Sequence, residues 1–158
     1  PDWVPEAMDS AFKEVVAAGV PLIIYNSGGM EAAKRQGAQN NEGSEEYVAG
    51  MGGGEYFAKS GAKNVLCVNT QPGAVNQEAR CKGLADGMAK GGGKATQLPL
   101  PASAFGNATA VAQAIKAARQ KDKNGDGIIT IGANDANAAA TGINQAGPVQ
   151  QAGGGRRR

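Results

Sequence analysis

Polar residues stand where three short apolar runs of this sequence end, and one basic residue lies in the first turn of a predicted helix. These residues are Asn26, Asn69, Arg80, Asn134 and Asp135. If the apolar runs are parallel strands, their carboxyl ends share one edge of the sheet, where ligands of open α/β sheets bind. Amide and guanidinium groups with little net charge suit a neutral, hydroxylated ligand. The pattern therefore favours a site that holds a small polar molecule by hydrogen bonds.

Each of these residues also has a simpler interpretation, because Asn and Asp are common in turns and helix caps. Asn134 precedes an alanine-rich helix expected at 136–146, and its side chain could cap the free N–H groups of the first turn. Capping and ligand binding both remain open for Asn134. A chance occurrence at three successive strand ends is the less economical explanation of the whole set.

The composition argues against several function classes. The chain has no histidine, which removes the commonest general base and zinc ligand. The net charge of +2 includes Arg156, Arg157 and Arg158, so the remainder is close to neutral and does not suit nucleic acid or a polybasic membrane contact. No apolar run reaches the roughly 20 residues of a membrane helix. The terminal Gly-Gly-Gly-Arg-Arg-Arg is expected to be a flexible tail.

The glycine-rich stretch Gly50–Gly54 lies between a weak strand expected at Tyr47–Ala49 and a short helix expected at 55–60. Backbone N–H groups in such loops can cradle phosphates. The fingerprint is incomplete, because Glu55 stands where its last glycine belongs and no Lys-Ser/Thr pair follows. A flexible turn is the better interpretation, and a nucleotide site is the alternative.

The segment Asp122–Ile129 matches the first part of an EF-hand calcium loop. Position twelve of that loop is Ala133, so the bidentate glutamate that completes the coordination is missing. The segment also leads directly into a predicted strand. We therefore expect a polar turn and no metal site.

Two cysteines, Cys67 and Cys81, lie on a predicted strand and on the next helix, both at inward-facing positions. They are too few for a four-ligand zinc site, and Cys67 has no histidine to activate it. A disulfide between them would close a loop of about 15 residues. Buried free thiols are the alternative.

The spacing of apolar residues predicts the order of helices and strands. Helices are expected at 5–18, 77–90, 107–120 and 136–146, with a short one near 31–36. Strands are expected at 20–25, 64–69, 95–98 and 128–131. This alternation indicates a mostly parallel sheet covered by helices on both faces, which is a three-layer α/β sandwich of flavodoxin-like architecture.

Five segments together resemble the type I periplasmic binding proteins, the ribose-binding-like sugar receptors of bacterial ABC importers. These segments are 17–28 (AAGVPLIIYNSG), 47–50 (YVAG), 61–69 (GAKNVLCVN), 78–83 (EARCKG) and 126–135 (DGIITIGAND). The resemblance runs from about Val15 to Gly147 and implies α/β lobes that close around a sugar. Some of these receptors have a similar Leu-Cys-Val-Asn and Arg-Cys pairing, which favours the disulfide Cys67–Cys81.

The resemblance also implies which residues contact the ligand. Asn26 and Ser27 match the polar pair of the segment between the lobes. Arg80 matches a ligand-binding arginine at a helix start, and Asn134 matches the asparagine of an Asn-Asp turn. Phe105 lies roughly where these receptors have an aromatic residue that stacks on the sugar ring.

The same resemblance divides the chain. Residues 1–29 correspond to the end of the first lobe, 30–46 to a connection, 47–147 to the second lobe and 148–158 to a flexible tail. Most of the first lobe and the usual elements after Gly147 are absent. The expected partners are a sugar-like ligand, the membrane permease of an importer and a first lobe supplied elsewhere.

The expected function is reversible binding of a sugar or similar small polar ligand, as the solute-binding component, or part of it, of a bacterial ABC importer. The expected location is periplasmic or extracellular, on the resemblance alone, since no signal peptide is recognisable. We expect no catalysis, no cofactor and no nucleic acid partner. Two alternatives are a nucleotide-dependent α/β enzyme that uses Gly50–Gly54, and a structural or signalling α/β domain that binds no ligand.

Overall fold

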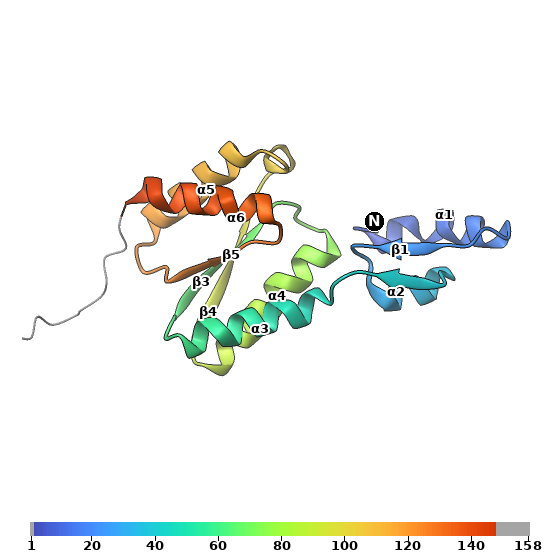
Figure 1. Ribbon diagram of the computed structural model, residues 1–158, viewed down its shortest axis with the longest axis horizontal. Helices are drawn as coiled ribbons and strands as arrows, with labels where there is room; N and C mark the ends of the chain where they lie inside the picture. Colours follow the sequence, from blue (N-terminus) through green and yellow to red (C-terminus); the bar gives the residue numbers. More distant parts are fainter. Residues whose placement is uncertain (1, 148–158) are drawn as a thin grey trace, which may run out of the picture.

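The computed structural model describes residues 2–147, which contain two parallel sheets, each with its own helices (Figure 1). The elements of the first unit are α1 (Pro5–Ala17), β1 (Ile23–Tyr25), α2 (Gly29–Gln36) and β2 (Asn40–Glu42). Those of the second unit are α3 (Glu46–Lys59), β3 (Asn64–Asn69), α4 (Val75–Lys90), β4 (Lys94–Pro99), the 3-10 helix η1 (Ala102–Ala104), α5 (Ala108–Lys121), β5 (Gly127–Ile129) and α6 (Ala133–Ala146). Residues 43–45 connect the two units. The tail expected at 148–158 lies outside the described residues.

The first unit is a two-stranded sheet with two helices. β1 pairs in parallel with β2, so that Ile23 lies opposite Asn40. Ile24 is buried, whereas Ile23 and Tyr25, on the other face of the strand, are each 58% exposed. The segment 30–46, expected as a connection, therefore contains most of α2 and all of β2. The sequence pattern missed β2 because its three residues, Asn-Asn-Glu, include no apolar side chain.

The second unit is a three-layer sandwich. Its sheet has the strand order β4-β3-β5 with parallel pairing throughout, and Figure 1 shows α3 and α4 on one face and α5 and α6 on the other. The sheet has a hydrophobic core on each face, and neighbouring residues of β3 belong to different cores. Cys67 packs with Leu84 and Met88, while Val68 packs with Val111 and Ile115. The predicted α/β architecture with a parallel sheet is confirmed.

Most of the predicted elements are present with small shifts at their ends. The helices expected at 5–18, 77–90 and 107–120 correspond to α1, α4 and α5, and the strand expected at 64–69 is β3. Asn107 caps α5, because its Oδ1 accepts a hydrogen bond from the N–H of Ala110 at 3.0 Å. The helix expected at 136–146 begins three residues earlier, at Ala133.

The strand expected at Tyr47–Ala49 and the turn expected at Gly50–Gly54 are wrong, because both segments belong to α3. The short helix expected at 55–60 is the last part of the same helix. Glycine in a helix interior costs about 1 kcal/mol relative to alanine, so a run of glycines normally signals a break. Here tertiary packing overrides that propensity.

Four glycines let the backbones of α3 and α4 touch. They are Gly50 and Gly54 on α3 and Gly83 and Gly87 on α4, one helical turn apart in each pair and all buried. A Cβ at Gly83 would lie 2.0 Å from the carbonyl oxygen of Tyr47, and the other three positions are comparably tight. Paired small residues at this spacing allow the closest approach of two helices. The glycine-rich stretch is therefore a helix contact surface rather than a phosphate loop.

Cys67 of β3 and Cys81 of α4 form a disulfide, with their Cα atoms 5.6 Å apart. This confirms the predicted pairing. The bond lies in the core between the sheet and α4 and fixes the helix against the central strand.

We expect Gly83→Ala to lower the free energy of unfolding by about 3 kcal/mol, because the added methyl group meets backbone atoms that cannot turn aside. Gly52→Ala is the matched control: Gly52 lies in α3, and a Cβ there would meet nothing within 4 Å. That substitution should stabilise the protein by up to about 1 kcal/mol. Urea unfolding followed by circular dichroism measures both, and wild-type stability of Gly83→Ala would contradict the backbone contact.

Replacing Cys67 and Cys81 together by alanine should lower the free energy of unfolding by about 3 kcal/mol, the value for a closed loop of about 15 residues. A thermal melt with and without dithiothreitol supplies the control. The reductant should lower the melting temperature of the wild type and leave that of the double variant unchanged. Equal sensitivity of the two proteins would contradict the prediction.

Candidate functional site

A cavity of about 180 Å³ lies where the two units meet. Its walls come from the turn after β1, from the connection together with the start of α3, and from the first turns of α4. The lining residues are Asn26, Ser27, Gly28, Gly29, Ser44, Glu45, Glu46, Tyr47, Val75, Asn76 and Ala79. Of the predicted ligand contacts, Asn26 and Ser27 therefore lie on this cavity.

Apart from Oε2 of Glu46, which is ion-paired with Arg80, two buried polar atoms at the cavity have no hydrogen-bond partner among the described residues. They are the hydroxyl oxygen of Ser27, a residue only 3% exposed, and Oδ1 of Asn76. A buried polar group without a partner costs about 1–3 kcal/mol. A hydroxylated molecule in the cavity could satisfy both atoms, since a hydroxyl group donates and accepts.

The backbone around Asn26 holds Ser27 in place. Asn26 has a φ of +70°, which Asn tolerates better than most residues, and its N–H donates to the carbonyl of Glu42 at 2.8 Å. Gly43 passes so close that a Cβ there would lie 3.0 Å from the Asn26 carbonyl oxygen. The turn after β1 is thereby packed against the connection between the units.

Arg80 lies one residue beyond the cavity wall. Its Nη2 forms an ion pair with Glu46, which does line the cavity, and its Nη1 donates to the carbonyl of Ile131 at 3.5 Å, a long contact. The Nε of Arg80 is buried without a hydrogen-bond partner in the described part of the chain. Arg80 therefore joins the start of α3 to the loop between β5 and α6 and keeps an unused donor.

Asn69 is fully buried at the carboxyl end of β3. Its Nδ2 donates to Glu78 at 2.9 Å, and its Oδ1 accepts from the N–H of Gln71 at 2.9 Å. The neighbouring Thr70 is held in the same way by Gln77, whose Oε1 accepts from the N–H of Thr70 at 2.8 Å. The side chain of Asn69 thus shapes the turn between β3 and α4.

Asn134 and Asp135 lie in the first turn of α6. The N-cap of that helix is Gly132 with no side-chain cap bond, so the capping alternative for Asn134 is wrong, and Asn134 is exposed. Asp135 is partly buried and hydrogen-bonded to Thr70. Burial raises the pKa of Asp135 above its ordinary value, and the hydrogen bond with Thr70 offsets part of that rise.

Phe105 lies in the loop after η1 and is 52% exposed. Its ring packs edge to face against Trp3 of the first unit, with ring centroids 6.3 Å apart. The structure therefore places the predicted residues in three groups: Asn26 and Ser27 on the cavity, Arg80 behind Glu46, and Asp135 with Thr70. Asn69, Arg80, Phe105, Asn134 and Asp135 do not line the cavity.

Sequence reasoning missed three residues of this region: Trp3, Glu46 and Asn76. Asn76 stands four residues before Arg80, which places both on one side of α4. That signal was hidden because the predicted helix began at Gln77 rather than at Val75. Glu46 is missed because it falls at the end of the expected connection 30–46, whereas in the structure it is the first residue of α3.

The segment Asp122–Ile129 forms a turn at 122–126 that leads directly into β5, as expected. One carboxylate oxygen of Asp126 accepts hydrogen bonds from the N–H groups of Lys63 and Asn64, at 2.6 and 2.9 Å. The carboxylate thus joins this turn to the start of β3. Within residues 2–147, no three or more His, Cys, Asp or Glu side chains are grouped so as to hold a metal ion.

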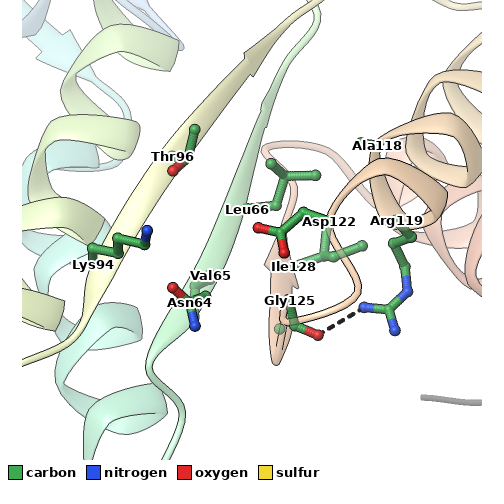
Figure 2. A pocket seen from close by; sticks show the side chains of 11 residues that line it. Asn64, Val65, Leu66, Lys94, Thr96, Ala118, Arg119, Asp122, Gly125 and Ile128 are labelled. Atoms are coloured by element: carbon green, nitrogen blue, oxygen red, sulfur yellow. Dashed lines mark hydrogen bonds between the residues drawn. The ribbon is translucent and has the colours of Figure 1, made fainter. Parts of the chain in front are cut away.

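A second, smaller cavity of about 50 Å³ lies at the opposite, amino-terminal edge of the sheet (Figure 2). Figure 2 shows Leu66 and Ile128 on the strands and Arg119 on the facing helix, where its Nη1 donates to the carbonyl of Gly125 at 2.9 Å. Ligands of open α/β sheets bind at the other edge. The cavity between the units is therefore the better candidate site.

Comparison with known proteins points to one family. The sequence model of a periplasmic binding protein domain matches residues 3–155. A carbohydrate transporter from Acidothermus cellulolyticus 11B, solved in complex with myo-inositol, shares 34% identity and superposes with a TM-score of 0.81 over 90% of this chain and 48% of the other. A comparison with curated proteins found no match.

Two further solved structures have the same fold at lower identity. An ABC transporter solute-binding protein from Burkholderia graminis C4D1M with D-arabinose is 22% identical, with a TM-score of 0.77 over 90% of this chain and 49% of the other. One from Actinobacillus succinogenes 130z with D-allose is 24% identical, with a TM-score of 0.72 over 89% and 50%. The chain thus spans about half the length of the structures it matches. None of the helices in residues 2–147 has both the length and the apolar character needed to span a membrane.

Asp135→Asn should remove a pH-dependent loss of stability. Because the folded-state pKa of Asp135 is raised, ionisation disfavours the folded state, and wild-type stability should fall as the pH rises from the ordinary Asp value through the raised one. The variant should gain stability relative to the wild type over that range, measured by urea unfolding between pH 3.5 and 7. Thr70→Val removes the offsetting hydrogen bond, so the stability of this variant should fall more steeply with rising pH than that of the wild type. A variant that loses relative stability with rising pH would contradict the assignment.

Proposed function

The chain belongs to the family of type I periplasmic binding protein domains, and from that premise we propose that it is part of the solute-binding protein of a bacterial ABC importer. Its ligand in this proposal is a cyclic polyol or a sugar. The observation that carries the proposal is the cavity between the units, with Ser27 and Asn76 offering buried polar atoms that lack partners. The relative at 34% identity was solved with myo-inositol, a ring with a hydroxyl group on every carbon.

The ligand is held by hydrogen bonds and released unchanged. Ser27 and Asn76 contact it from the two units, and Arg80 contributes its free Nε. Asn26 lines the same cavity from the turn after β1. The absence of histidine from the sequence fits capture without bond chemistry.

We place the boundary between the lobes at residues 43–45. Residues 2–42 then form the end of the first lobe and residues 46–147 form the second, because β2 pairs with β1 and α3 packs on α4. The open face of β1, with Ile23 and Tyr25, is where the remainder of a first lobe packs in this proposal. The complete protein functions in the periplasm or outside the cell and delivers its ligand to a membrane permease.

The nucleotide-dependent alternative loses its structural basis. Gly50 and Gly54 are buried in α3 against the backbone of α4, so their N–H groups are not available to a phosphate.

Isothermal titration calorimetry of the chain against myo-inositol, D-allose and D-arabinose tests the proposal. Replacing Arg80 should weaken the binding of the preferred ligand by about 10- to 100-fold, since hydrogen bonds from charged groups contribute about 1.5–3 kcal/mol. Because Arg80→Ala would leave Glu46 without its ion-pair partner, the variant of choice is Arg80→Gln with Glu46→Gln. Both charges are then removed while the polar contacts remain.

Arg119→Ala is the matched control, because Arg119 is also partly buried and bonded to a carbonyl but lies at the opposite edge of the sheet. It should bind as the wild type does. Equal binding by the Arg80 variant would exclude Arg80 from the site. Failure of the wild type to bind any of the three ligands would favour the domain that binds no ligand.

A further inference from the structure

The starts of three helices meet at the cavity between the units. From the first unit, α2 contributes its N-cap, Gly28, and its first residue, Gly29. From the second unit, α4 contributes its first two residues, Val75 and Asn76. The third helix, α3, contributes its N-cap, Glu45, and the two residues that follow it. The cavity is therefore lined by helix starts from both units.

These helix starts carry backbone N–H groups that have no partner within their own helix. In residues 2–147, no side chain caps α2, α3 or α4 at its start. One N–H group is used across the units, because that of Val75 donates to the carbonyl oxygen of Trp3 at 3.0 Å. The cavity is thus supplied with backbone donors that a ligand can use.

The balance of charge at the cavity favours an anion. A helix start is equivalent to about +0.5 elementary charge, so three of them amount to about +1.5. Two carboxylates also line the cavity. That of Glu46 is ion-paired with Arg80, and that of Glu45 belongs to an exposed residue, where water and salt screen its charge. The other side chains that line the cavity are uncharged, so the field of the helix starts prevails.

The buried hydroxyl group of Ser27 is an independent sign of a ligand at this place. Ser27 immediately precedes the N-cap of α2, lines the cavity and is 3% exposed, and its Oγ has no hydrogen-bond partner among the described residues. This hydroxyl can donate to an anionic oxygen, and such charge-assisted bonds are the stronger ones. The unpartnered Oδ1 of Asn76 can only accept, which suits a hydroxyl group of the ligand.

We propose that the cavity takes a cyclic polyol or sugar that carries an anionic oxygen group, a carboxylate or a phosphate. The anionic group lies among the three helix starts and accepts a hydrogen bond from Ser27, while a ring hydroxyl donates to Asn76. Helix starts bind phosphate and carboxylate groups through these same backbone donors. This inference rests on the proposed function and names the class of its ligand as acidic rather than neutral.

Calorimetric titration with two matched pairs of compounds tests the requirement for charge. The pairs are myo-inositol with myo-inositol monophosphate, and D-glucose with D-glucuronate. In at least one pair, the anionic member should bind about 10-fold more tightly than the neutral one, and the pair that shows this distinguishes phosphate from carboxylate. The advantage should shrink as the ionic strength rises from about 0.01 to about 0.15 M, while binding of the neutral member stays constant.

Two substitutions of Glu45 separate its charge from the hydrogen bonds of the helix start. Glu45→Gln removes the negative charge and should tighten binding of the anionic compound about threefold. Glu45→Asp keeps the charge but places a capping side chain on the free N–H groups of α3. It should raise the melting temperature and weaken binding of the anionic compound about 3- to 10-fold. Glu55→Gln is the control, because Glu55 lies in the same helix and is ion-paired with Lys90, away from the cavity. It should leave the affinity unchanged.

The outcomes separate this inference from the proposed function. Equal affinity within both pairs would overturn the acidic ligand, and so would a Glu45→Asp variant that gains stability yet binds the anionic compound as the wild type does. Either result leaves the proposed function intact if myo-inositol or another neutral compound binds. A wild type that binds none of the four compounds, D-allose or D-arabinose would overturn the proposed function, and this inference with it.

Discussion

The backbone contact between α3 and α4 fixes the geometry on which the rest of the site depends. Gly50 packs so closely that a Cβ there would lie 2.1 Å from the carbonyl oxygen of Arg80. The same contact that joins the helices therefore sets the position of Arg80, and it brings Glu46, in the first turn of α3, within ion-pair distance of that arginine. The disulfide from Cys67 fixes α4 from its other side against β3. A helix held on both sides can present Asn76 and Arg80 at a constant position.

The sequence predicted the layers of the second unit well, because its strands and helices carry strong and regular apolar patterns. It failed at α3, where the helix is stabilised by a neighbour that local propensity does not describe. By local propensity, Gly50 and Gly54 should interrupt a helix. The helix continues because these two glycines pack against Gly83 and Gly87 of α4. It also failed at β2, whose polar residues are paired through backbone atoms alone with β1. Both errors concern long-range contacts.

The same distinction between local features and long-range contacts decides which residues of the candidate site could be predicted. Asn26 and Ser27 could be found because a turn at a strand end is a local feature, and the cavity does contain them. Asn69 was placed correctly at a strand end, but its side chain is occupied by Glu78 and the turn, which spacing alone could not reveal. The contact of Trp3 with Phe105 could not be predicted, because it joins residues about a hundred positions apart in the chain.

The two units are joined by few contacts. The connection at 43–45, the hydrogen bond from Val75 to Trp3 and the pair of Trp3 with Phe105 are the links described above. A sparse interface allows one unit to move relative to the other, which is the ordinary behaviour of units joined by small, polar contacts. A ligand that satisfies polar atoms on both sides, such as Ser27 and Asn76, would stabilise the closed arrangement in proportion to its differential affinity for that state.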